Sequence, residues 1–283
     1  MVVLTGLASL HRQRIAAQID FGCGAHASCQ GPQAELGDTF IMSSERNKPV
    51  TVWMLRASCL WLCLTCECVA QPAARPRPPR ELAGLPLVFQ DDFDEATPER
   101  FLFSDPAAWR WRTQDGNTVL EQFQASQVEN PVRSPFNRAL LRGLHLADVI
   151  IDVRLQSTIK DYDHRDMCLF FGFQDPSHMY YVHLGKKADD HANQIFIVDG
   201  APRRKISLKS TAGTPWTDAW HHARVVRRVE TGEITVYFDD MEQPVMRAVD
   251  KTFGSGLVGL GTFDDTGRFD DLRIYGTRVE PPR

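Results

Sequence analysis

The chain reads Met167-Cys-Leu-Phe-Phe-Gly-Phe173, then Gln174-Asp-Pro-Ser177, then His178-Met-Tyr-Tyr-Val-His-Leu184. Each apolar run is too short for a typical helix, and residues that favour turns separate the two runs. The stretch therefore predicts two antiparallel strands joined by a turn. Side chains alternate between the faces of a strand. The second run accordingly places Met179, Tyr181 and His183 on one face, and Tyr180, Val182 and Leu184 on the other.

Similar short runs continue on both sides of this stretch, with Gly, Pro, Asp and Thr between them. Asp199-Gly200 and Thr231-Gly232 are typical of hairpin turns, and no segment of useful length after Leu85 has helical periodicity. Many short strands separated by turns favour a sandwich or a barrel. We predict an all-β fold, a two-sheet antiparallel jelly-roll sandwich over residues 85–277. The runs that predict strands are 87–91, 149–155, 167–173, 178–184, 194–198, 205–208, 220–226, 234–238, 256–260 and 269–275.

The N-terminal part carries an export signal. Met54-Leu-Arg56 precedes a short apolar run, and small residues follow at Cys68-Val-Ala70. This pattern predicts a signal peptide at 54–70 and a secreted or periplasmic protein, although an apolar core segment of a cytosolic protein is the alternative. Residues 1–53 are interpreted as a non-native or disordered extension, with Met42 or Met54 as the true start. Residues 71–84 are interpreted as a Pro/Arg-rich linker and 278–283 as a tail.

Charge and cysteine content exclude some partners and cross-links. The formal net charge of −4 gives no reason to expect nucleic acid as a partner, and no stable membrane insertion is expected after signal cleavage. Six of the 7 cysteines precede residue 70, so the predicted sandwich holds Cys168 alone and forms no internal disulfide. Cys63 and Cys66 have a spacing used by zinc and redox sites, but no second ligand pair follows.

The order of several landmarks carries a family resemblance. Phe89-Gln-Asp-Asp-Phe93 opens the predicted domain, Trp220-His221 begins a strand, and Phe269-Asp-Asp-Leu-Arg-Ile-Tyr-Gly276 closes it. Over residues 85–277 the chain resembles the concanavalin A-like lectin/glucanase superfamily. Within it, the chain is similar to LamG-like domains and to the DUF1080, or 3-keto-disaccharide hydrolase-like, group. The resemblance implies a jelly roll that acts on carbohydrate. The Glu-x-Asp-x-x-Glu signature of laminarinase-type members is absent.

A charged segment, Asp161-Tyr-Asp-His-Arg-Asp166, precedes the buried strand. Its guanidinium, Arg165, can form paired hydrogen bonds to vicinal hydroxyls. Asp163, His164 and Asp166 are candidate catalytic residues, because glycoside cleavage uses a pair of carboxyl groups. The alternative interpretation is a solvated turn whose charges satisfy one another.

Further candidates for sugar binding lie on the second strand and in the loops that follow. Tyr181 and His183 share one face, and Asn193 and Gln194 could donate hydrogen bonds to hydroxyls. Trp216 follows a proline and is expected to be an exposed platform for a sugar ring, whereas Trp220 is expected in the core. The alternatives are a core strand with a satisfied histidine and amides that cap a turn.

Acidic residues at both ends of the domain suggest a metal site. Asp91 and Asp92 lie near the start and Asp270 and Asp271 near the end. First and last strands often pair in this architecture, and Ca²⁺ prefers several oxygen ligands. We expect that these four residues can bind a structural Ca²⁺ ion, although no cofactor is required. The alternative is two exposed acidic strand ends.

Three functions remain open on the sequence alone. The first is a secreted domain that binds an oligosaccharide or polysaccharide on its concave sheet. The second is a glycoside hydrolase of the DUF1080 kind, with a carboxyl or histidine whose pKa is shifted by desolvation. The third is a structural or adhesive domain that binds proteins through an apolar patch.

Overall fold

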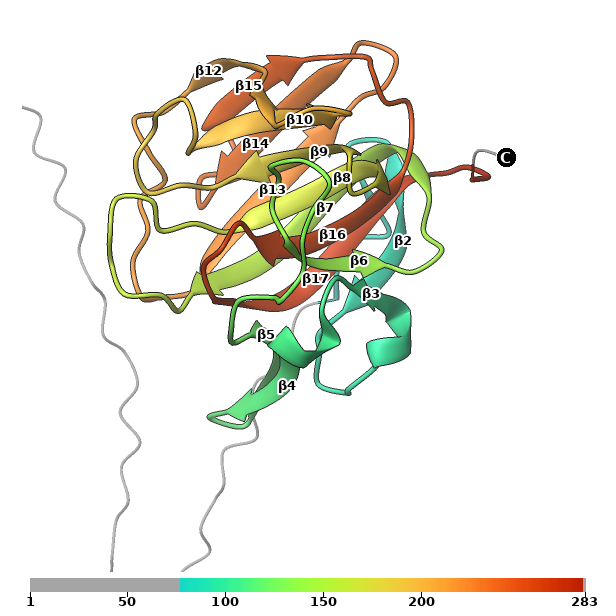
Figure 1. The fold of residues 1–283 in the computed structure, drawn as a ribbon. Coiled ribbons are helices and arrows are strands. Elements are labelled where there is room, and N and C mark those ends of the chain that lie inside the picture. The colour runs from blue at the N-terminus through green and yellow to red at the C-terminus, as the bar shows by residue number, and fades with distance from the viewer. Residues whose placement is uncertain (1–76, 282–283) are drawn as a thin grey trace, which may run out of the picture. The chain divides into compact units, whose positions relative to one another are not determined.

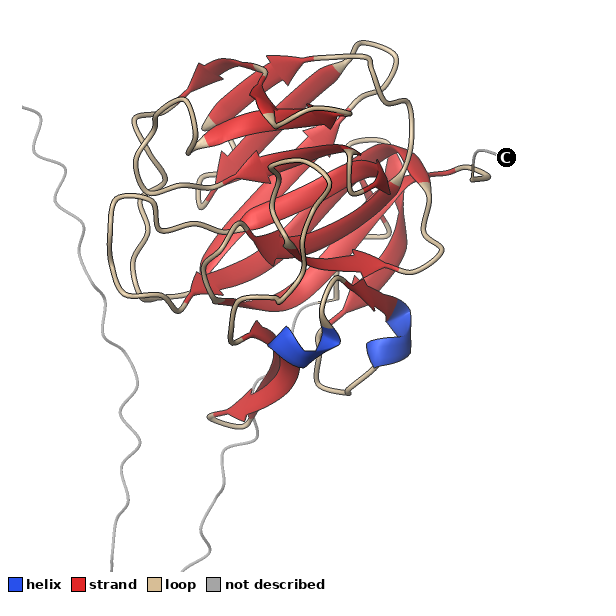
Figure 2. Ribbon diagram, viewed as in Figure 1, coloured by secondary structure: helices blue, strands red, loops and turns tan. Residues whose placement is uncertain are grey.

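A computed structural model describes residues 77–281 of the chain. The predicted extension, the predicted signal peptide and residues 71–76 of the predicted linker lie outside the described residues. The regular structure of the described part is almost entirely strand, joined by long loops, with two single-turn 3₁₀ helices, η1 (Pro98–Arg100) and η2 (Pro106–Ala108), as Figure 2 shows. No helix in this part is long and apolar enough to cross a membrane.

The larger sheet contains the first and last strands of the described part, side by side. β2 pairs with β17 in antiparallel register, with Leu272 opposite Asp91. In spatial order its strands are β1 (Glu81–Leu82), β2 (Leu85–Asp91), β17 (Gly267–Arg278), β7 (Leu146–Ser157), β13 (His221–Arg227), β14 (Glu233–Phe238), β15 (Met246–Val249) and β12 (Ser207–Ser210). A hairpin of β4 (Trp109–Gln114) and β5 (Asn117–Gln122) joins this sheet through β5 and β17.

The smaller sheet contains the stretch that opened the sequence analysis. In spatial order its strands are β11 (Arg204–Lys205), β10 (Gln194–Asp199), β9 (His178–His183), β8 (Cys168–Asp175), β16 (Leu257–Thr262), β6 (Asn137–Leu141) and β3 (Phe101–Phe103). Its neighbours are all antiparallel, and the sheet faces the larger one (Figure 1). The predicted all-β fold, a two-sheet antiparallel jelly-roll sandwich, is confirmed.

Alternation along the strands separates two apolar layers. On β9, Tyr180 and Val182 are buried in the main core between the sheets, whereas Met179 and Tyr181 belong to a second cluster on the outer face of the smaller sheet. The predicted assignment of the faces is therefore confirmed. We call this second cluster the outer aromatic layer; its buried members are Leu140, Cys168, Phe170, Phe173, Met179, Tyr181, Phe196, Val198 and Leu257.

The outer aromatic layer is covered. The long connection between β5 and β6 crosses in front of β8, β9 and β16 (Figure 1), and its Val132 packs on the layer. Arg203 adds a second cover, since its guanidinium lies 4.9 Å from the ring of Phe196 and 4.1 Å from that of Phe263. The backbone N–H of Arg203 also donates to the carbonyl of Arg133 in the long connection. This face is thus closed by the chain's own loops.

Several strands of the structure were not predicted from the sequence, and one predicted boundary lies elsewhere. The missed strands are β3, β4, β5, β6 and β15, and β1 lies within the predicted linker, where Leu82 pairs with Leu85. The hairpin of β4 and β5 turns at Asp115-Gly116, where both residues have positive φ. Asp-Gly with two positive φ angles is a favoured two-residue hairpin turn.

Candidate functional site

An open hollow of about 680 Å³ lies where β7 runs into the loop before β8. Amide, hydroxyl, carboxylate, ammonium and guanidinium groups line it, and this variety suits recognition of a hydroxyl-rich ligand. Its volume falls within the range of small-ligand sites. The lining residues are Gln156, Ser157, Thr158, Ile159, Lys160, Asp161, Asp218 and Arg268. We call this feature the β7–β8 hollow.

Arg165 fixes the walls of the β7–β8 hollow from beneath. Its side chain is 2% exposed, and its Nε donates to Ser157 Oγ at 3.0 Å. Its Nη2 donates to the carbonyl of Ser157 and to Asp218 Oδ1, both at 2.9 Å, and its Nη1 lies 3.6 Å from Asp161 Oδ1. Asp218 and Asp161 are 94% and 57% exposed. One buried cation therefore holds two solvent-facing carboxylates in place.

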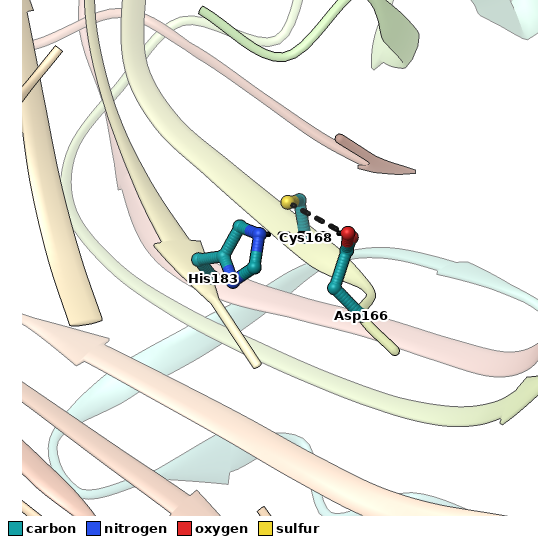
Figure 3. A group of neighbouring side chains, drawn as sticks. All are labelled: Asp166, Cys168 and His183. Atoms are coloured by element: carbon teal, nitrogen blue, oxygen red, sulfur yellow. Dashed lines mark hydrogen bonds and ion pairs between the residues drawn. The ribbon is translucent and has the colours of Figure 1, made fainter. Parts of the chain in front are cut away.

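Next to the hollow, the ends of β8 and β9 hold a buried polar cluster. Figure 3 shows Asp166, Cys168 and His183 converging. Asp166 Oδ2 lies 3.4 Å from His183 Nε2, and its Oδ1 lies 3.8 Å from the Cys168 sulfur. The backbone N–H of Phe263 donates to the same Oδ1 at 2.9 Å. On the other side of the imidazole, the Asn193 N–H approaches His183 Nδ1 at 3.4 Å. The cluster ties the turn after β16 to these two strands.

Two carboxylates from the turn between β16 and β17 adjoin this cluster. Asp264 and Asp265 place carboxylate oxygens within 4.8 Å of those of Asp166. Burial, followed by the charge of Asp166, raises the pKa of Asp265 to about 7 and also raises the pKa of Asp264. Asp265 accepts the Tyr162 hydroxyl at 2.7 Å and the Asp166 N–H at 2.8 Å. Both residues lie in the turn at Asp264-Asp-Thr-Gly267, and the sequence did not predict their place in this cluster.

The structure does not bring the predicted catalytic candidates together. Asp163 pairs with Lys187 at 2.9 Å, and His164 pairs with Asp189 at 3.0 Å, both at the surface. Asp166 instead lies buried against His183. These three residues contact separate partners, so the arrangement offers no acid and base facing a common substrate position. Their catalytic role stays a prediction that the geometry does not favour.

Tyr181 and His183 lie on the face that was predicted, but beneath a cover. Tyr181 is 0% exposed, and its hydroxyl accepts Arg203 Nη1 at 3.1 Å. The ring of His183 packs against those of Phe196 and Phe263. A sugar cannot reach either side chain in this structure. Strand alternation predicted correctly that these two side chains share a face. Their burial could not be predicted, because the covering loop is distant in sequence and gives no local signal.

Asn193 and Gln194 are also buried, and their side chains serve the chain itself. Asn193 Nδ2 donates to the Thr211 carbonyl at 3.0 Å, and its Oδ1 accepts the Thr214 hydroxyl at 2.8 Å. Gln194 Nε2 donates to the Asp189 carbonyl at 2.9 Å. The alternative interpretation, amides that stabilise loops, describes these residues better than sugar contact.

The expected roles of the two nearby tryptophans are reversed. Trp216 is 6% exposed, packs on Phe238 and His221, and donates its indole N–H to the Leu184 carbonyl at 2.7 Å. Its prediction as an exposed platform is wrong, because the loop folds its ring back between the sheets. Trp220 is the half-exposed residue, with the Arg154 guanidinium over its ring.

The acidic residues expected to bind calcium lie in two places. Asp91, Asp92 and Asp271 line a cavity of about 400 Å³ beside β2 and β17, as strand pairing predicts. Asp270 does not line this cavity and accepts Asn117 Nδ2 at 2.9 Å.

The chemistry of this cavity suits calcium only in part. The oxygens of Asp91 already accept the Phe93 N–H, the Thr97 hydroxyl and Arg100 Nη1. Carboxylates suit Ca²⁺, but Arg100 occupies the place of a cation on Asp91. Calcium at this cavity stays a prediction.

Several site residues escaped the sequence analysis although weak signals were present. Asp166 lies only two positions before Cys168, the first residue of β8, so the two side chains are near neighbours. Cys168 is also paired directly with His183 across the sheet. Asp218 and Gln156 reach the β7–β8 hollow from segments about sixty residues apart in sequence, a proximity that only the assembled fold reveals.

No family model matches the chain, and a search of curated proteins found no similar sequence. Solved structures with a similar fold include the carbohydrate-binding module CBM66 from Bacillus subtilis. It is 14% identical with a TM-score of 0.46, over 62% of this chain and 96% of that one.

A second is domain 4 of AbnA, a GH43 extracellular arabinanase from Geobacillus stearothermophilus, in complex with arabinotriose. It is 16% identical with a TM-score of 0.39, over 61% of this chain and 77% of that one. A third is a Lotus tetragonolobus seed lectin, 13% identical with a TM-score of 0.43, over 68% and 99%. At these identities and scores, the likeness does not establish what this chain binds.

Proposed function

We propose that this jelly-roll domain binds carbohydrate at the β7–β8 hollow. The observation that carries the proposal is the exposed pair Asp161 and Asp218, held by the buried Arg165 at the walls of a hollow of about 680 Å³. Sugars present several hydroxyls at once, and fixed polar groups bind them without a large loss of side-chain entropy. This site replaces the face of Tyr181 and His183 favoured by the sequence, because that face is covered.

Neighbouring residues support recognition of a polar ring. Gln156 is held at the hollow by two contacts, since its Nε2 donates to the Asp218 carbonyl at 2.6 Å and its Oε1 accepts Arg268 Nη1 at 3.2 Å. Tyr162 directly follows Asp161 and is 42% exposed, while its hydroxyl is anchored on Asp265. A partly exposed and immobilised aromatic ring is suited to stacking on a sugar face.

The proposal is tested by screening the full-length chain on a glycan array and titrating the best ligand by calorimetry. Replacing Asp218 with alanine removes one wall of the hollow, and we expect affinity to fall about tenfold, the value of one or two hydrogen bonds. Asp163→Ala is the matched control, because Asp163 is an exposed aspartate outside the hollow, and it should leave affinity unchanged. Binding that is indifferent to Asp218→Ala, or absent for every glycan, contradicts the proposal.

The same samples separate the other two functions. An assay for released sugars detects the hydrolase of the DUF1080 kind that the sequence resemblance implies. The described residues hold no observation that favours this function over binding. If no glycan binds on the array and no sugar is released in the assay, a structural or adhesive domain is favoured.

We also propose that the chain is exported. Met54-Leu-Arg56, the apolar run after it and the small residues at Cys68-Val-Ala70 support this proposal, and they lie outside the described residues. Sequencing the N-terminus of the native product tests it. A mature chain beginning at Gln71 or Pro72 is expected, and a product that retains residues 54–70 would contradict export by this signal.

A further inference from the structure

Asp166, Cys168 and His183 form a tripod on the outer face of the smaller sheet. Cys168 on β8 is paired directly with His183 on β9. Asp166 lies two residues before Cys168, so its side chain points to the same side of the sheet. The ligand atoms of all three side chains therefore converge on one point, as Figure 3 shows. All three residues are buried.

The spacing of these atoms fits a tetrahedral ion. Zinc–nitrogen, zinc–oxygen and zinc–sulfur bonds in proteins place neighbouring tetrahedral ligands about 3.3–3.6 Å apart. The separations here are 3.4 Å from His183 Nε2 to Asp166 Oδ2 and 3.8 Å from the Cys168 sulfur to Asp166 Oδ1. The three ligand atoms lie within 4.8 Å of one another. Because these two separations run to different oxygens of Asp166, the carboxylate must rotate to present one oxygen to both partners.

The charge around the tripod also favours a cation. Carboxylate oxygens of Asp264 and Asp265 lie within 4.8 Å of those of Asp166. Within residues 77–281, Asp166 alone among these three carboxylates makes an ion-pair contact, and its partner is His183. No lysine or arginine nitrogen of this range lies within 4.0 Å of the three carboxylates. Arg203 and Arg133 act on Asp264 from farther away. These three neighbouring carboxylates repel one another, and the repulsion is stronger because Asp166 and Asp265 are buried. A divalent cation would offset it.

We propose that Asp166, Cys168 and His183 bind one Zn²⁺ ion. A thiolate, an imidazole and a carboxylate are a ligand set that zinc accepts and that calcium or magnesium does not. A carboxylate of Asp264 or Asp265, or a water molecule, completes four ligands. The three main ligands are buried, so the ion is structural: it locks the β16–β17 turn onto the ends of β8 and β9.

Binding requires two protons to change place. The Cys168 thiol releases its proton to solvent, because the thiolate is the ligand. The Asn193 N–H approaches His183 Nδ1 at 3.4 Å, which places the imidazole proton on Nε2 before the metal enters. The proton moves to Nδ1 as Nε2 takes the ion, where it would face the Asn193 N–H, so these two donors must move apart.

Cobalt substitution tests the proposal on the full-length chain. After treatment with EDTA and its removal, Co²⁺ is added, and a thiolate-to-cobalt charge-transfer band is expected at one equivalent. Zn²⁺ should displace Co²⁺ and abolish the band. Cys168→Ala should eliminate the band and lower Zn²⁺ affinity roughly 100-fold or more, since loss of an outer-shell partner alone can reach that size. His183→Gln is the second variant, checked for folding by circular dichroism.

The six cysteines before residue 70 need their own control. Cys63→Ser/Cys66→Ser removes the C-x-x-C pair and should leave the band intact. His164→Ala removes an exposed histidine that also contacts an aspartate, and it too should have no effect. A band that is absent from the wild-type chain overturns the proposal. A band that persists in Cys168→Ala overturns it as well, whichever of the six N-terminal cysteines supplies the thiolate.

Discussion

Replacing Asp265 with asparagine should stabilise the metal-free protein at alkaline pH and not at acid pH. Burial and the charge of Asp166 raise the pKa of Asp265 to about 7, whereas an unfolded aspartate titrates near 3.9. Between about pH 4 and pH 7 the native state holds a proton that the unfolded state has lost. The free energy of unfolding contributed by this group therefore falls as pH rises through that window and is lowest above pH 7.

The size of the effect follows from the shift. A pKa shift of about three units, at about 1.4 kcal/mol per unit, changes the free energy of unfolding by about 4 kcal/mol as an upper bound. Structural relaxation reduces this change to roughly 2–3 kcal/mol. Asparagine has the shape of the protonated acid: its amide oxygen can accept the Asp166 N–H, and its amide N–H can donate to the Tyr162 hydroxyl oxygen, the reverse of the present bond. Asp265→Asn should thus equal the wild type near pH 4 and exceed its stability by this amount at pH 8.

Urea denaturation in EDTA at pH 4, 6 and 8 measures the difference. Asp163→Asn is the control, because Asp163 is exposed and paired with Lys187, and it should change stability by less than about 1 kcal/mol at each pH. A difference between Asp265→Asn and the wild type that stays constant across these three pH values would refute the reasoning. A variant that is less stable at pH 8 would do the same.

Three further predictions concern the core, the sheet and the acidic cavity. Trp216→Ala should lower the free energy of unfolding by about 3–5 kcal/mol in thermal or urea melts, because the ring is buried; a loss below 1 kcal/mol would indicate an exposed ring. Gly261→Ala places a methyl group 1.8 Å from the Asn137 carbonyl oxygen and should destabilise by about 3 kcal/mol or more, whereas Gly254→Ala meets only a side chain at 3.9 Å and should be nearly neutral. Calcium at one hundred times its Kd should raise Tm by about 5–10 °C in EDTA-washed protein, and Asp91→Asn should abolish the rise; an equal rise in the variant excludes this cavity.

The sequence was sufficient for the features that depend on local pattern. Alternation in His178–Leu184 correctly separated Met179 and Tyr181 from Tyr180 and Val182, and the structure places the second pair in the core between the sheets. Asp199-Gly200 and Thr231-Gly232 lie at hairpins, where Gly200 and Gly232 have positive φ. Asp115-Gly116 was equally readable and was overlooked. Each of these features is determined by neighbours in the chain, so the sequence records it directly.

The candidate site depended on contacts that no local pattern records. Tyr181 is buried because a connection more than forty residues earlier in the chain folds over it. Trp216 and Trp220 have similar local contexts, and only the packing of the loop decides which ring enters the core. Arg165 was correctly selected from its charged segment, but its partner Asp218 could not be inferred before the fold was known.

The central claim is that ligand binds at the β7–β8 hollow and not on the covered face of the smaller sheet. Amide chemical shifts of the isotope-labelled full-length chain, recorded during titration with the strongest glycan from the array, test it most directly. The largest changes should fall on residues 156–162, Asp218 and Arg268. Changes centred on Tyr181, Phe196 and the loop that covers them would contradict it.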